Sequence, residues 1–133
     1  MTTDLLKKIY LADAASCAAF FALFVLATGK VSTLLGIDAG IITAGGWICL
    51  GAAALLAWLG TRATPPALLA WLVVFLNIDW MIASVIVFEL EFATLTALGR
   101  VVILAQAAGV LGFVALEAAG ARTLPRNRAR ATA

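Results

Sequence analysis

Histidine is absent from this 133-residue chain, and charged residues make up only 12% of it. The absence of imidazole excludes histidine-ligated haem, zinc and copper sites on this chain alone. The two cysteines, Cys17 and Cys49, form no CxxC redox motif. The chain also lacks a phosphate-binding glycine loop and the nucleophile elbow of serine hydrolases. We therefore expect no catalytic residues, no bound metal, no cofactor and no enzyme activity.

Hydrophobic residues make up 65% of the chain, whereas a soluble domain has roughly half. They form four long runs, and a bilayer core about 30 Å thick needs about 20 apolar residues for one helical crossing. The runs are rich in alanine and leucine and lack the alternating pattern of an outer-membrane barrel. We predict an all-α polytopic membrane protein, an antiparallel four-transmembrane-helix bundle. Its single domain is predicted over residues 1–120, with spans at about 9–28, 41–59, 68–88 and 98–119.

The polar breaks between the runs are predicted to be turns. Residues 30–40 suit an amphipathic turn at the membrane surface. Pro65 and Pro66 stand where a helix can begin, because the first helical turn does not need the missing N–H. Thr94 or Thr96 suits the N-cap of the last helix, since a threonine hydroxyl accepts a hydrogen bond from a free backbone N–H.

The first run has a competing interpretation as a secretory signal peptide, because Lys7 and Lys8 precede it. A signal-peptide core has about 7 to 15 apolar residues. This run is longer, and no small-residue cleavage site follows it. We therefore expect the first helix to be retained.

Basic residues are distributed unevenly among the breaks. Lys30 and Arg100 fall on one side of a four-span hairpin, and the other seven fall on the opposite side. The positive-inside rule then places both termini in the cytoplasm. Residues 121–133 are predicted to be a basic, disordered cytoplasmic tail that contacts anionic lipid. No aromatic residues alternate with the arginines of this tail, so nucleic acid is not expected as a partner. The seven basic residues on the side predicted to be cytoplasmic are Lys7, Lys8, Arg62, Arg122, Arg126, Arg128 and Arg130.

Asp79 is the acidic residue placed deepest in a predicted span. It lies about a dozen residues into the third run, which is about 18 Å along a helix. An acid at the bilayer centre costs roughly 2.5 to 3.5 kcal/mol, so each one is a candidate functional site. Gln106 is expected at the same depth as a hydrogen-bond partner, and Arg100 is a charged alternative.

The third run is expected to be polar on two opposite faces. Asn77 and Ser84 point the same way on a helix, whereas Asp79 lies about 200° from Asn77. A helix in an isolated four-helix bundle exposes one flank to lipid. We therefore predict that this helix is enclosed or contacts another subunit, in a homo-oligomer or beside other membrane subunits.

Two further features concern helix packing. Asp13 and Glu117 are expected near the cytoplasmic ends of their helices, on a shared polar seam. Two carboxylates there suit a divalent cation, but no third oxygen-rich ligand is evident. In the second run, Gly45, Gly46 and Cys49 form a strip of small residues that lets two helix backbones approach closely.

Three short segments resemble those of a group of small four-span bacterial integral membrane proteins of uncharacterised function. They are Leu11–Ser16, Leu76–Trp80 followed by Ser84, and Ala105–Ala107. The resemblance covers the whole chain in outline. It implies a bacterial inner membrane and identifies no site.

These observations favour a non-catalytic inner-membrane protein that acts through helix contacts, as an accessory or structural subunit of a membrane assembly. The alternative is a small oligomeric transporter or channel that uses Asp79 as its proton or cation site.

Overall fold

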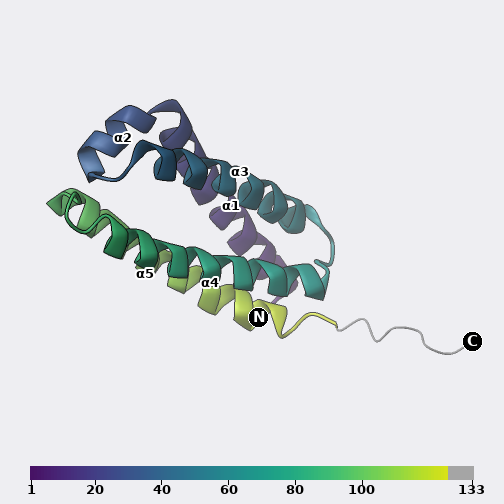
Figure 1. The fold of residues 1–133 in the computed structure, drawn as a ribbon. Coiled ribbons are helices and arrows are strands. Elements are labelled where there is room, and N and C mark those ends of the chain that lie inside the picture. The colour runs from purple at the N-terminus through teal and green to yellow at the C-terminus, as the bar shows by residue number, and fades with distance from the viewer. Residues whose placement is uncertain (126–133) are drawn as a thin grey trace, which may run out of the picture.

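The structure, a computed structural model, describes residues 1–125. These residues form five helices and no strand. Two pairs of long helices make up two layers, with α1 beside α3 and α4 beside α5 (Figure 1). In chain order the helices are α1 (Thr3–Leu26), α2 (Thr28–Leu35), α3 (Ala39–Thr61), α4 (Ala67–Leu90) and α5 (Ala97–Ala121).

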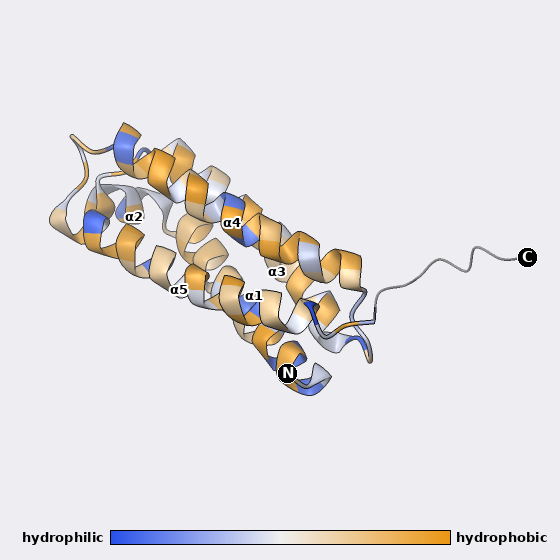
Figure 2. Cartoon of the chain, turned by 90° about the horizontal axis from the view of Figure 1, so that it is seen from below, coloured by the Kyte–Doolittle hydropathy of each residue, from blue (hydrophilic) through white to orange (hydrophobic). Residues whose placement is uncertain are grey.

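Four of these helices, all except α2, are long and apolar enough to cross a membrane. Figure 2 shows that these helices are mainly apolar, with hydrophilic residues at the start of α1 and in the middle of α4. The prediction of an all-α protein with four long apolar helices is therefore confirmed, and their composition is consistent with contact with a lipid bilayer. Helices α3, α4 and α5 extend by one or two residues beyond each end of their predicted spans, whereas α1 begins at Thr3 instead of residue 9 and ends at Leu26 instead of residue 28.

The helix ends follow from local capping. The Thr2 hydroxyl accepts from Leu5 N (3.3 Å) at the start of α1. Asp38 Oδ1 accepts from Gly40 N (2.8 Å) at the start of α3. Thr96 caps α5, as one of the two predicted candidates. These side chains satisfy N–H groups that have no partner within a helix.

The break expected to be a turn at residues 30–40 instead contains α2. This helix ends at Gly36, whose φ of 73° lies in the left-handed region that favours glycine. The segment before α5 is bonded to it, because Thr96 N donates to Leu35 O (3.1 Å) and Thr94 Oγ1 donates to Gly36 O (2.9 Å). Hydropathy alone did not reveal α2, because it is short and is stabilised by these tertiary contacts.

The buried core is divided between the two ends of the molecule. One cluster joins α1, α3, α4 and α5 at the end where the N-terminus lies beside the end of α5 (Figure 1). The other joins α2 to α3 and α5 at the opposite end. Leu124 is buried in the first cluster, so the chain stays packed beyond the expected start of the tail at residue 121. Residues 126–133 of that predicted tail lie outside the described part of the chain.

Helices α1 and α3 pack closely because α3 has small residues where they meet. A Cβ added at Gly46 would lie 2.8 Å from Val25 Cγ2, and one at Gly60 would lie 2.7 Å from Leu11 Cδ2. Cys49 is buried on the same helix. Two of the three predicted packing residues, Gly46 and Cys49, therefore lie in the interior.

Candidate functional site

Asn77 joins three helices at the centre of a buried polar cluster. Its Nδ2 donates to Asp13 Oδ2 (3.1 Å) on α1 and to Glu117 Oε2 (2.9 Å) on α5. Asp13 is 4% exposed and Glu117 is fully buried. We call Asp13, Asn77 and Glu117 the carboxylate cluster.

No basic side chain in the described part of the chain pairs with the carboxylate cluster. Within residues 1–125 the one ion pair joins Lys7 to Asp4 at 3.6 Å, near the start of α1. A buried carboxylate without a cation carries a large desolvation cost, which a proton or a bound cation removes. The cluster is therefore an uncompensated acidic centre inside the protein.

Two other polar residues, Cys17 and Tyr10, adjoin this centre. Cys17 Sγ donates to Asp13 Oδ1 at 3.8 Å. Glu117 Oε1 and Tyr10 Oη are buried and have no hydrogen-bond partner among the described residues. Most buried polar atoms in proteins are paired, so these two oxygens are exceptions to that rule.

Asp13 lies deeper along its helix than expected. It is ten residues beyond Thr3, the first residue of α1, which is about 15 Å along the axis. The expectation of a position near the helix end was wrong because α1 begins six residues earlier than the predicted span. Asn77, which was expected on the face of its helix opposite to Asp79, contacts both Asp13 and Glu117.

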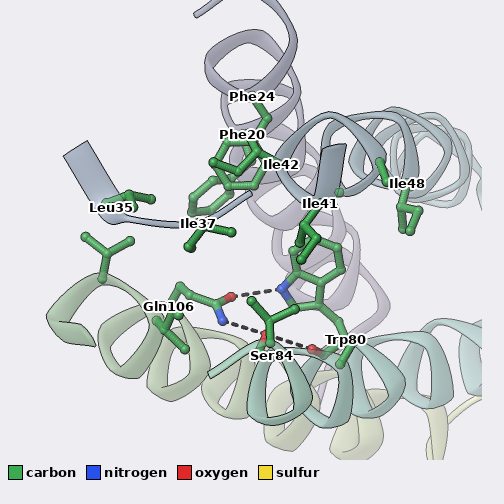
Figure 3. Close-up of a pocket in the computed structure, with 16 residues that line it drawn as sticks. Phe20, Phe24, Leu35, Ile37, Ile41, Ile42, Ile48, Trp80, Ser84 and Gln106 are labelled. Carbon is green, nitrogen blue, oxygen red and sulfur yellow. Dashed lines mark hydrogen bonds between the residues drawn. The ribbon is translucent and has the colours of Figure 1, made fainter. Parts of the chain in front are cut away.

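A second polar network ties α4 to α5. Trp80 Nε1 donates to Gln106 Oε1 (2.8 Å), and Gln106 Nε2 donates to Ser84 Oγ (2.8 Å), as Figure 3 shows. The Ser84 hydroxyl in turn donates to Trp80 O (2.8 Å). Both the oxygen and the nitrogen of the Gln106 side chain are thus hydrogen-bonded to α4.

Asp79 has neither of its two expected partners. Gln106 bonds Trp80 and Ser84 instead, because it faces the side of α4 that carries Asn77. Arg100 folds over the Phe92 ring, with its guanidinium carbon 4.5 Å from the ring centre. Asp79 itself is exposed and makes no hydrogen bond to any residue in the range 1–125. Equal depth did not predict a hydrogen bond between Asp79 and Gln106, because it ignores the direction in which each side chain points.

A cleft separates the α1–α3 layer from the α4–α5 layer, and it has two compartments. The first has a volume of about 310 Å³ and is largely apolar; Figure 3 shows Phe20, Ile42 and Trp80 among its walls. The second, of about 480 Å³, reaches the carboxylate cluster. The two compartments share Phe20, Ile48, Trp80, Ala83 and Gln106.

Trp80 stands between the two compartments. Its indole lines both of them, and its Cη2 would lie 3.4 Å from a Cβ added at Gly45 on α3. The ring thus reaches across the cleft from the α4–α5 layer to the α1–α3 layer. Gly45, predicted as a packing residue between helices, provides the surface that this ring approaches.

No family model, no curated protein and no solved structure matches this chain. The candidates for function are therefore the polar residues that the fold itself brings together. Within the described chain, no group of three or more histidine, cysteine, aspartate or glutamate residues is arranged to hold a metal ion. The cleft is suited to hydrogen bonding and to holding positive charge beside carboxylates.

Tyr10 and Trp80 are the residues that sequence reasoning missed as parts of a site. Trp80 carried a detectable signal, because it lies three residues after Asn77 and four before Ser84 and so shares their face of a helix. Tyr10 carried no such signal. Its position depends on how α1 packs against the rest of the protein.

Proposed function

We propose that this chain is a non-catalytic helix-bundle protein of a bacterial inner membrane, and that it serves as an accessory or structural subunit of a membrane assembly through contacts made by α4. The observation that supports this proposal is the exposed position of Asp79. The residues around it on the same face of α4 are also exposed and apolar, namely Leu72, Phe75, Leu76, Ile82 and Ile86.

The physical argument rests on the cost of that carboxylate in lipid. Asp79 is twelve residues beyond Ala67, the first residue of α4, which is about 18 Å along the helix. Facing acyl chains, an acid at this depth costs about 2.5 to 3.5 kcal/mol. A neighbouring subunit whose helix presents a hydrogen-bond donor or a basic group removes this cost, and the apolar residues around Asp79 give that helix a surface to pack on.

The proposed orientation places both termini in the cytoplasm. The start of α1, the end of α3 and the end of α5 lie at the same end of the molecule (Figure 1), and in sequence these helix ends carry Lys7 and Lys8, Arg62, and Arg122. The positive-inside rule supports this assignment. Anionic lipid headgroups are the proposed contact for this basic end.

Site-specific photocrosslinking in native membranes tests the subunit proposal. A photoreactive side chain at Ile82, which is 54% exposed on α4, is expected to form an adduct with a neighbouring subunit. The matched control is the same side chain at Leu111, which is 55% exposed on α5 and is expected to contact lipid. Asp79→Leu is expected to reduce the Ile82 adduct and leave the chain folded.

Mass measurement of the adduct distinguishes a second copy of the chain from a different subunit, and either result supports the proposal. Recovery of the chain only as a monomer in mild detergent, together with no adduct from Ile82, contradicts it.

The second candidate is a small oligomeric transporter or channel with Asp79 as its proton or cation site. A specific observation favours it, because Asp79 lines the same cleft compartment as Asp13 and Asn77. A solute flux into proteoliposomes that is lost in Asp79→Asn supports this function. Loss of the crosslinked complex without any flux supports the subunit role.

A further inference from the structure

The larger compartment of the cleft is acidic, and the described residues that line it carry no positive charge. Asp13 and Asp79 both line it, and none of the described residues around it is lysine or arginine. Behind its wall, Asn77 joins Asp13 to the fully buried Glu117. A ligand that carries positive charge is therefore favoured in this compartment, and an anionic one is opposed.

The same compartment is otherwise apolar. Aromatic rings of Phe20, Trp80 and Phe113 line it together with aliphatic residues. The face of an aromatic ring attracts a cation, and this attraction is strongest where water is excluded. The walls therefore fit a cation whose charge is surrounded by hydrocarbon better than a hydrated inorganic ion.

The adjoining compartment offers space for the apolar part of such a ligand. It lies beyond Trp80 and is lined by Ile37, Ile42 and Val87. Its volume and that of the acidic compartment are each in the range of small-molecule sites, which is about 300 to 1,000 Å³.

We propose that the cleft between the two helix layers is a binding site for a lipophilic organic cation. The charged centre lies beside Asp13, among the rings of Phe20 and Phe113, and the apolar part extends past Trp80 into the second compartment. This site goes beyond the subunit role and does not depend on it, since all of its residues belong to one chain.

Asp79 has a different part in this site from Asp13. Asp13 is 4% exposed, so it contacts a ligand only after the ligand has entered the cleft. Asp79 lines the compartment but is exposed, on the face of α4 that the proposed function assigns to a neighbouring subunit. We therefore expect Asp13, and not Asp79, to hold the cation.

Two probes of the same shape and opposite charge test the proposal. The protein is placed in nanodiscs of uncharged phosphatidylcholine, and equilibrium binding of tetraphenylphosphonium and tetraphenylborate is measured against empty nanodiscs. We expect saturable binding of tetraphenylphosphonium and only unsaturable partitioning of tetraphenylborate. Asp13→Asn is expected to weaken the binding of tetraphenylphosphonium by about tenfold or more.

A pair of glycine variants tests the location without removing a charge. A Cβ at Gly109 or at Gly112 meets no atom within 4 Å, so both positions on α5 accept a larger side chain. Gly109 lines the acidic compartment, whereas Gly112 is exposed and is not among the residues that line either compartment. Gly109→Leu is expected to weaken tetraphenylphosphonium binding by about tenfold because it fills the cleft, and Gly112→Leu is expected to leave it unchanged.

Equal saturable binding of both probes overturns the proposal, as does the absence of saturable tetraphenylphosphonium binding. If Asp13→Asn fails to fold, the glycine pair decides, and equal affinity in Gly109→Leu and Gly112→Leu overturns the proposed location. A flux or crosslinking result for Asp79 changes none of these outcomes, so the site and the subunit role fail separately.

Discussion

Trp80 donates its indole N–H to the side-chain oxygen of Gln106 at 2.8 Å, and this bond holds the ring across the interior cleft. The same ring approaches Gly45 on the opposite helix layer and lines both compartments. The orientation of one side chain thus determines how the cleft is divided. Since the bond joins α4 to α5, it also contributes to the hairpin that carries Asp79.

Replacement of Gln106 by leucine is expected to weaken the α4–α5 hairpin. The variant leaves the Trp80 indole N–H without its acceptor and removes the donor to Ser84. Hydrogen bonds between membrane helices contribute about 0.6 to 2 kcal/mol, so a loss of about 1 kcal/mol in unfolding free energy is expected. Unfolding by sodium dodecyl sulfate in mixed micelles measures it, with the exposed Leu104→Ala as control. An unchanged unfolding free energy in Gln106→Leu would mean that the hydrogen bond does not stabilise the hairpin.

Substitutions of Asn77 and of Glu117 in the carboxylate cluster are expected to change the unfolding free energy differently. Asn77→Leu removes the side-chain amide that bonds both Asp13 and Glu117, so a loss of about 1 to 3 kcal/mol in unfolding free energy is expected. Glu117→Gln keeps an acceptor for Asn77 and removes one uncompensated acid, so it is expected to be neutral or stabilising. Parallel unfolding curves measure both. Greater destabilisation by Glu117→Gln than by Asn77→Leu would contradict the view that the acids lack compensation.

Substitution of Gly36 by alanine is expected to disrupt the docking of α2. The residue has a φ of 73°, and its new Cβ would lie 2.1 Å from the Thr94 carbonyl oxygen. Left-handed strain costs about 1 to 2 kcal/mol before the backbone contact is counted. Gly29→Ala is the control within the same helix, since nothing lies within 4 Å of its Cβ. Thermal unfolding in detergent is expected to show a lower midpoint for Gly36→Ala alone, and equal midpoints would refute this account of the α2 end.

The α1–α3 layer is expected to depend on Gly46. A leucine there would push against Val25 and Phe24, whose side-chain atoms lie 2.8 and 3.0 Å from a Cβ at this position. Overpacking of this kind costs about 1 to 3 kcal/mol. Gly51→Leu is the control on the same helix, because its Cβ meets no atom within 4 Å. Disulfide crosslinking between one cysteine placed on α1 and one on α3 measures the distance between the helices. Equal crosslinking in Gly46→Leu and Gly51→Leu would show that the helices do not separate.

The number and approximate bounds of the long helices were determined by the sequence alone. An apolar run of membrane-spanning length has to satisfy its own backbone hydrogen bonds in lipid, and a helix does so without any tertiary contact. The sequence also offered Thr96 as one of two candidates for the N-cap of α5, because capping depends only on nearby residues. Helix α2 was not, because a short helix that depends on Thr94 and Thr96 leaves no sign in local hydropathy.

Only the tertiary structure decided which polar residues meet. In a soluble helix the apolar face identifies the interior, but in a membrane helix both the lipid-facing and the interior faces are apolar. The sequence therefore placed Asp79, Gln106 and Asn77 at particular depths without fixing the direction of each side chain. Asn77 bonds acids that are 64 and 40 residues away in the chain, and Gln106 bonds Trp80 while Asp79 remains exposed. The rotation of each helix about its axis, which is fixed by packing between the two layers, produced this arrangement.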